Sequence, residues 1–168
     1  AYFRDFALIG YGSGIGIDYG DGVNMFPEGG IENVSIGNYD IGIRLRKSYY
    51  MSVNDVSMAG VGIGLQNIDS NAITVSGLNI SACGMGLDVK GNGNSYTGGS
   101  VQACVTGAIL GGFSSALSGF YFEQNTTALI VTGRSQTILS NFYASNTGPI
   151  IISGHNNNLF SDEISTPV

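Results

Sequence analysis

The chain has 168 residues, of which 43% are hydrophobic, only 11% are charged and 27 are glycine, and its formal net charge is −6. This length suits one domain with a substantial core, and so many glycines without a collagen period indicate frequent tight turns. The negative charge disfavours nucleic acids and anionic membranes as partners, and no apolar run is long enough to insert into a bilayer.

A repeat of 21 or 22 residues runs along the chain, and Ile73 to Val89 is its clearest copy. Each copy has an anchor residue of a type that tolerates a left-handed backbone, which predicts one tight bend in every copy. Apolar residues lie two positions before the anchor and one, three, ten and twelve positions after it. The anchors are Asp5, Asn33, Asp55, Gly77, Gly98, Gly119, Asn141 and Asp162.

Aligned on these anchors, the copies form columns of apolar residues that alternate with polar ones. Alternation at period two indicates short strands, and a fixed repeat of such strands indicates a solenoid whose coils pair about 4.8 Å apart. The column two positions before the anchor contains Phe3, Ile31, Val53, Val75, Tyr96, Leu117, Leu139 and Phe160. The column ten positions after it contains Ile15, Ile43, Leu65, Leu87, Ala108 and Leu129.

Three short elements illustrate the repeat: Asn33 to Ile36 (NVSI), Gly42 to Leu45 (GIRL) and Tyr121 to Asn125 (YFEQN). The pattern resembles the right-handed parallel β-helix of the pectate-lyase-like superfamily, and most nearly the shafts of bacteriophage tailspikes and capsule depolymerases. The resemblance implies an all-β fold, a right-handed parallel β-helix solenoid of about eight coils with a 21–22-residue repeat. Residues 1–168 would form one such domain.

The same resemblance implies a function. A tailspike-like domain binds and cleaves a bacterial surface polysaccharide, such as capsule or O-antigen. It would act as a homotrimer in the virion tail, outside the cell. Both ends of the sequence lie inside a coil, so we expect a fragment of a longer chain whose flanking domains contact other tail proteins. The alternative is a non-catalytic shaft or receptor-binding segment of a tail fibre or adhesin.

The first coil, Ala1 to Ile17, is followed by the one clear insertion. The step from Asp5 to Asn33 is 28 residues, so about six extra residues lie between Tyr19 and Ile31, in a loop at 20–30. Insertions in solenoids often lie on a functional face, and a carbohydrate or cation contact is one interpretation. An elaborated turn is the interpretation that we favour.

Two outward surfaces follow from the register. A polar patch could bind an acidic polysaccharide through arginine forks, although a ladder of surface ion pairs is the interpretation that we slightly favour. Its members are Asp18, Arg44, Arg46, Gln66, Asp88 and Lys90.

The outward column that contains Arg44, Gln66 and Asp88 continues with three isoleucines, Ile109, Ile130 and Ile151. An exposed apolar stripe marks a contact surface, so these residues are the candidate trimer interface, unless a loop or neighbouring domain covers them.

A third surface combines aromatic and polar side chains. Tyr121 and Tyr143 fall in one outward column, with Glu123 beside Tyr121 and Gln102 one coil earlier. Stacked aromatic faces pack against the C–H side of a sugar ring, so this group is a candidate sugar platform. Aromatic packing between subunits is the alternative interpretation.

Glycoside hydrolysis needs two carboxyl groups facing each other across the bond, roughly 5 to 9.5 Å apart. Glu123 and Asp88 are the candidates, although the register places them on different sheets. A lyase would instead use cations to neutralise a uronate, a role open to Arg44, Arg46 and Lys90. We favour a hydrolase over a lyase, but the polygalacturonase signatures NTD, DD, GHG and RIK are missing.

The sequence predicts neither a metal site nor a cofactor. No zinc-type cysteine spacing and no calcium-type Asp cluster occurs. Cys83 and Cys104 fall in one column of adjacent coils. Their spacing would permit a disulfide, but two stacked, buried thiols are the interpretation that we favour.

Overall fold

The structure is a computed structural model that describes residues 1–160 and 163–165, and these residues form two parallel sheets. The first, ten-stranded sheet contains β1 (Tyr2–Ile9), β3 (Phe26–Gly37), β5 (Ser48–Ala59), β7 (Thr74–Ser81), β9 (Ser95–Gln102), β11 (Ala116–Glu123), β13 (Thr137–Leu139), β14 (Phe142–Ala144), β16 (Asn158–Phe160) and β17 (Glu163–Ser165). The second, seven-stranded sheet contains β2 (Ile15–Tyr19), β4 (Ile41–Arg46), β6 (Ile63–Ile68), β8 (Met85–Val89), β10 (Thr106–Leu110), β12 (Thr127–Val131) and β15 (Ile151–Ile152).

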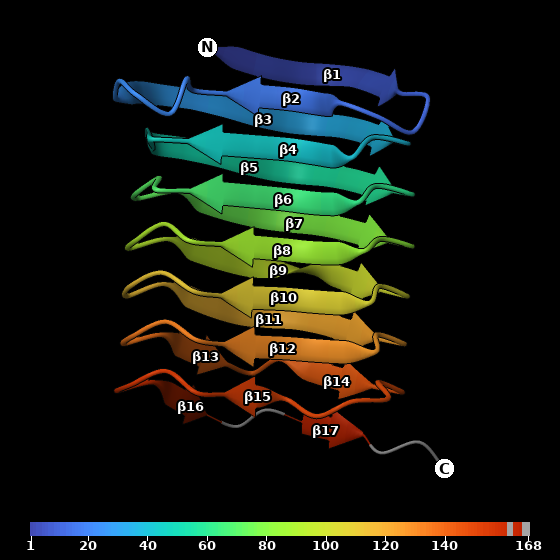
Figure 1. Cartoon of the computed structure of the whole chain (residues 1–168), viewed down its shortest axis with the longest axis vertical. Helices are drawn as coiled ribbons and strands as arrows, with labels where there is room; N and C mark the ends of the chain where they lie inside the picture. The colour runs from blue at the N-terminus through green and yellow to red at the C-terminus, as the bar shows by residue number, and fades with distance from the viewer. Residues whose placement is uncertain (161–162, 166–168) are drawn as a thin grey trace.

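The chain alternates between the two sheets and descends by one strand at each pass (Figure 1). In this view the nearer strands of the second sheet run to the left, and the farther strands of the first sheet run to the right. A chain that descends in this way is a right-handed coil, the hand expected for parallel crossovers. The seven strands of the second sheet mark seven coils, and β16 begins an eighth. The predicted all-β solenoid is therefore confirmed.

A left-handed residue bends each long strand of the first sheet. Asp5, Asn33 and Asp55 have φ of 59°, 50° and 50°, and the glycine anchors Gly77 and Gly98 have 62° and 61°. At this bend the alternation of inward and outward side chains restarts, so that both halves of the strand bury apolar residues. The predicted bend is thus confirmed in these copies, and Asp162 lies outside the described residues.

The register of the seventh copy differs from the prediction by one residue. Leu117 pairs with Ile138 rather than with Leu139, and the left-handed residue is Ser140, with φ of 50°, rather than Asn141. Asn141 instead points inward and is 1% exposed. Its amide accepts a hydrogen bond from the Phe120 N–H at 2.9 Å and donates to the Leu117 carbonyl at 3.2 Å. These bonds satisfy the polar group inside the core, which makes the shifted register possible.

The first coil is also shifted relative to the prediction. Phe3 pairs with Ile31, 28 positions on, whereas Ile17 pairs with Ile43, 26 positions on. Later coils step by 22 residues, as from Ile31 to Val53. The step from β1 to β3 is therefore six residues longer, and the step from β2 to β4 four residues longer. Two of the six extra residues thus precede β2, and four follow it. The predicted pairing of Ile15 with Ile43 is therefore wrong, because part of the insertion lies in the turn before β2.

The core between the sheets is apolar, but buried amides line its corners. Asn125 is 0% exposed, accepts a hydrogen bond from the Cys104 N–H at 3.0 Å, and donates one to the Val101 carbonyl at 2.9 Å. Such ladders join successive coils where no strand pairing does. The other buried amides are Asn67, Asn94, Gln136 and Asn141. Among the described residues, no buried side-chain nitrogen or oxygen lacks a hydrogen-bond partner.

Cys83 and Cys104 occupy the same corner column as Asn125, and both are buried free thiols. Their thiols donate to the carbonyls of Ser81 at 3.2 Å and Gln102 at 3.3 Å. The hydrogen bond with the Cys104 thiol, followed by burial, raises the pKa of Cys83. The structure therefore has the stacked thiols that we favoured.

Within the described ranges, no helix has the length and apolar character needed to cross a membrane.

Candidate functional site

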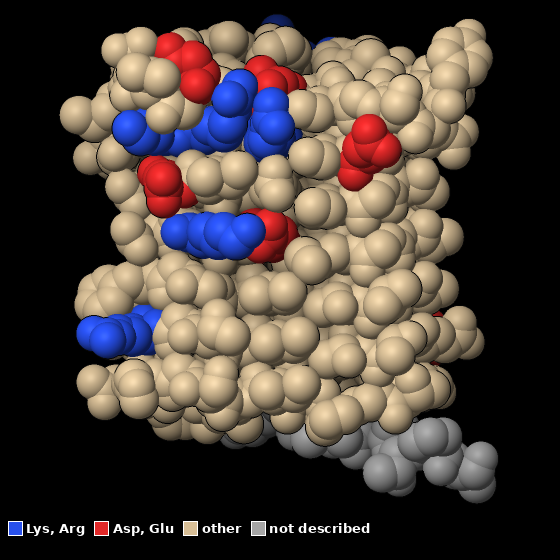
Figure 2. All heavy atoms as spheres, viewed as in Figure 1, with Lys and Arg blue, Asp and Glu red and all other residues tan. Residues whose placement is uncertain are grey.

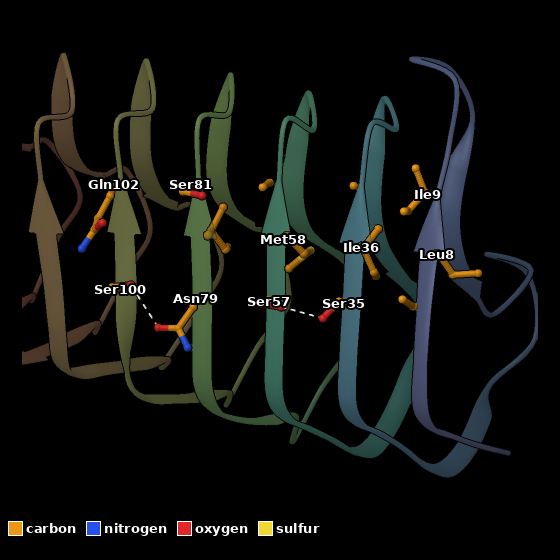
Figure 3. Close-up of a pocket in the computed structure, with 14 residues that line it drawn as sticks. Leu8, Ile9, Ser35, Ile36, Ser57, Met58, Asn79, Ser81, Ser100 and Gln102 are labelled. Atoms are coloured by element: carbon orange, nitrogen blue, oxygen red, sulfur yellow. Dashed lines mark hydrogen bonds between the residues drawn. The ribbon is translucent and has the colours of Figure 1, made fainter.

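A shallow groove lies on the outer face of the first sheet, beyond the bend, and crosses β1, β3, β5, β7 and β9 (Figure 3). Its volume is about 500 Å³. One outward column supplies the floor, and it contains Ala7, Ser35, Ser57, Asn79 and Ser100. The next outward column contains Ile9, Gly37, Ala59, Ser81 and Gln102. The face is hollow because both columns consist mostly of small side chains.

The floor of the groove is a ladder of hydroxyl and amide groups. The Ser35 and Ser57 hydroxyls lie 2.9 Å apart and share a hydrogen bond. Ser100 donates to Asn79 Oδ1 at 3.0 Å, and Asn79 Nδ2 donates to the Gly77 carbonyl at 3.4 Å. A hydroxyl donates once and accepts twice, so these groups retain capacity for a ligand. Strand pairing repeats them about every 4.8 Å along the solenoid.

An aromatic pair continues the floor column beyond Ser100. Tyr121 pairs with Ser100 in the sheet, and its ring stacks on Phe142 with the ring centroids 5.2 Å apart and the planes at 6°. Glu123 pairs with Gln102, so its carboxylate lies beside this end of the groove. Partial burial, and then the negative charge of Glu123, raise the pKa of Tyr121. An outward pair of stacked aromatic rings therefore exists at this position, but its second ring is Phe142 rather than Tyr143.

The predicted partner, Tyr143, does not belong to this platform. It is 2% exposed and stacks on the buried Phe122, with centroids 5.4 Å apart. The cause is the one-residue shift at Asn141, which turns Phe142 outward and Tyr143 inward. The prediction of two stacked, outward tyrosines is wrong for this reason.

The charged patch lies on the second sheet, and Figure 2 shows charged side chains gathered over its upper coils. Asp18 pairs with Arg44 in the register, yet it binds the guanidinium groups of both Arg44 and Arg46. Its carboxylate accepts from Arg44 Nε at 3.1 Å and from Arg46 Nη2 at 2.9 Å. The hydrogen bond from Arg44 lowers the pKa of Asp18 and raises that of Arg44.

A second ion pair occupies the middle of this patch. Asp88 is 5% exposed, and its carboxylate accepts hydrogen bonds from Gln66 Nε2 at 3.1 Å and Lys90 Nζ at 3.0 Å. The predicted members thus lie together, but Asp18 and Asp88 form ion pairs with all three of the basic members, Arg44, Arg46 and Lys90. This arrangement matches a ladder of ion pairs more closely than an open anion site.

The candidate catalytic carboxylates do not meet. Glu123 belongs to β11 in the first sheet and Asp88 to β8 in the second, with the core between them. Asp88 is also nearly buried and paired with Lys90. Two carboxyl groups on opposite sheets cannot flank one glycosidic bond, so this pair does not supply hydrolysis.

The three isoleucines form the continuous outward column that the sequence predicts. Ile109 pairs with Ile130, and Ile130 pairs with Ile151. Ile109 and Ile130 are half-buried, and Ile151 is 41% exposed. The column continues the line of Asp88, which pairs with Ile109, so one outward row changes from charged to apolar.

The sequence reasoning missed the serines and the asparagine of the groove floor as a site. The signal was present, since a whole outward column of small polar residues leaves an open trough.

In the described part of the chain, no cluster of three or more His, Cys, Asp or Glu side chains is arranged to hold a metal ion. No protein-family model matches the chain, and neither a curated protein nor a solved structure matches it.

Proposed function

We propose that this chain is a β-helical recognition domain that binds an extended bacterial surface polysaccharide, capsule or O-antigen, along the groove of the first sheet. The observation that carries the proposal is the groove itself. Its hydroxyl and amide ladder is regular and uncharged, and it ends beside the Tyr121–Phe142 pair. Sites for sugars combine such polar groups, which bind hydroxyls, with an aromatic face for the C–H side of the ring.

Binding without cleavage is the version that the geometry supports better. The two candidate acids lie on different sheets, and Asp18 engages the arginines that a lyase would need for a uronate. A tail fibre, tailspike shaft or adhesin needs a stiff domain that recognises a surface, and a stacked solenoid provides one. The resemblance noted above supports a place in a virion tail.

The same proposal includes assembly. The outward isoleucine column lies on the second sheet, opposite the groove, so a homotrimer formed through Ile109, Ile130 and Ile151 would leave the groove open. Contacts with other tail proteins of the virion are part of the same proposal.

Binding of purified capsules and O-antigens tests the proposal directly. Ser57→Phe places a large ring on the groove floor and should reduce binding at least tenfold. Ser76→Phe is the matched control, because Ser76 is also an exposed serine of the first sheet that bonds a neighbouring coil, to Asn54 at 2.7 Å, but lies before the bend. Equal binding by both variants would place the ligand elsewhere.

Cleavage is measured in the same samples. We expect no new reducing ends and no ultraviolet absorbance from unsaturated uronates. New reducing ends without absorbance would show a hydrolase and contradict the non-catalytic version. Reducing ends with absorbance would show a lyase and contradict it equally.

A further inference from the structure

A second hollow lies at the corner that follows the second sheet, at the level of β8, β10 and β12. Its volume is about 370 Å³. Its lining is Asp69, Lys90, Asn92, Gly111, Gly112, Phe113, Thr132, Gly133 and Arg134. This corner lies at the other end of the second-sheet strands from the groove, and the two sites share no residue.

Glycines create this hollow. Gly111 stands between Lys90 and Thr132 in one outward column, so that row has a gap of one side chain. In the next row, Gly112 packs against the Gly91 carbonyl so closely that no side chain fits. Phe113 follows in the corner row, bridged to Asn92 in the preceding coil and to Arg134 in the next.

The side chains around the hollow have unused binding capacity. Arg134 is exposed, and its guanidinium makes no ion pair or hydrogen bond with any other described residue. The Lys90 side chain is 57% exposed, and Asp88 engages one of its three donors at 3.0 Å. Phe113 is 52% exposed and presents an apolar surface between them.

Two further lining residues supply acceptors and an amide. Asp69 is exposed, and Asn92 uses its Oδ1 for the Phe113 N–H at 3.0 Å, which leaves its amide nitrogen free to donate. An anion with several charges, such as phosphate, would be repelled by the Asp69 carboxylate and would gain nothing from Phe113. A ligand with one carboxylate, several hydroxyls and an apolar face would satisfy all of these groups.

We propose that the hollow binds an acidic monosaccharide unit. The sugar carboxylate lies between Lys90 and Arg134, the C–H face lies against Phe113, and hydroxyls reach Asp69 and Asn92. Charge-assisted bonds from arginine and lysine to a carboxylate are among the stronger polar contacts, and an aromatic face complements a pyranose ring. The site is independent of the groove, and either can bind if the other does not.

The test uses nuclear magnetic resonance with the intact chain. D-glucuronate and D-galacturonate are titrated, with D-glucose and inorganic phosphate as controls. At least one uronate should shift the Gly111 and Phe113 amide signals in a saturable manner, while glucose and phosphate at equal concentration should not. No saturable shift with either uronate would overturn the proposal, and equal binding of phosphate would reduce the hollow to a simple anion site and overturn it too.

Two variants locate the site. Arg134→Gln removes one charged donor and should weaken uronate binding about tenfold. Gly111→Leu should abolish it by filling the hollow, and the fold should tolerate this change because an added Cβ would meet its nearest neighbours no closer than 3.4 Å. Arg4→Gln, on an exposed arginine of β1, is the charge-matched control and should bind normally. If Gly111→Leu binds uronate as the unmodified chain does, the ligand lies elsewhere and the proposal fails.

Discussion

The two outer faces of this solenoid share one repeat and one core, yet they differ in chemistry. The groove of the first sheet has an uncharged lining, and its small hydroxyl and amide side chains leave about 500 Å³ of open space. On the second sheet, the corresponding row begins with paired charges and changes to isoleucine at Ile109. Packing restricts most inward positions to apolar residues and the rest to hydrogen-bonded amides, whereas outward columns vary freely. The outward columns are therefore where recognition and assembly can differ between faces.

The largest expected effect comes from the core beneath both faces. Ile80 lies under the groove and Leu87 under the charged row, and they are 1% and 0% exposed. Replacing either with Ala should lower the free energy of unfolding by about 3 kcal/mol, because a cavity remains. Urea unfolding followed by circular dichroism measures this, with Ser76→Ala expected to change stability by less than about 0.5 kcal/mol. A much smaller loss for one of the two core variants would show that the faces do not share a core.

A corner amide should have the next largest effect. Asn125→Leu leaves the Cys104 N–H and the Val101 carbonyl without the partners that they have at 3.0 Å and 2.9 Å. Unpaired buried groups of this kind should lower the free energy of unfolding by about 2 kcal/mol. Asn79→Leu makes the same change on the exposed groove floor and should alter stability far less. Equal losses in the two variants would mean that the ladder contributes nothing beyond side-chain size.

The isoleucine column predicts a difference in assembly between the faces. Ile130→Asp places a charge in the middle of the column and should convert the proposed trimer into monomers in sedimentation velocity. Thr97→Asp, on the exposed face of the first sheet, should leave the sedimentation coefficient unchanged. Circular dichroism checks that both variants keep their strands. If Ile130→Asp sediments as the unmodified chain does, the column is not the interface.

Sequence reasoning succeeds where one residue type has one physical role. Asp5, Asn33 and Gly77 adopt the left-handed bend because few other residues tolerate it, so their spacing alone predicts the coil. It fails where two neighbouring residues suit the same position. Ile138 and Leu139 are both apolar, and the inward hydrogen bonds of Asn141 favour the register that places Ile138 in the buried column.

The same limit applies to the candidate sites. The charged row could be predicted because outward positions follow from the register, and Asp18, Arg44 and Arg46 do lie together. The position of Tyr143 could not be predicted, because a one-residue shift in register turns every later side chain of the strand to the opposite face of the sheet. The corner hollow exists because Gly111 has no side chain. A space left by a glycine is harder to recognise in a sequence than a side chain that is present.

The smallest expected effect distinguishes the two faces by pH. The hydrogen bond from Arg44 lowers the pKa of Asp18 below its ordinary value of 3.8. A group whose pKa is lowered by folding stabilises the fold above its unfolded pKa, and this contribution disappears as the pH falls through the folded value. The Asp18 side chain is 31% exposed, so solvent screening should limit the contribution to less than about 1 kcal/mol.

Comparison of the unmodified chain with Asp18→Asn measures this contribution. The difference in free energy of unfolding should be constant from neutral pH to about pH 5, shrink below about pH 4, and decrease in high salt. The groove lining contains no ionisable side chain, so polysaccharide binding there should not change over the same range of salt or between about pH 5 and pH 8. Salt-sensitive binding would instead indicate that the ligand contacts charged residues, and would move the recognition surface from the groove to the charged row or the corner hollow.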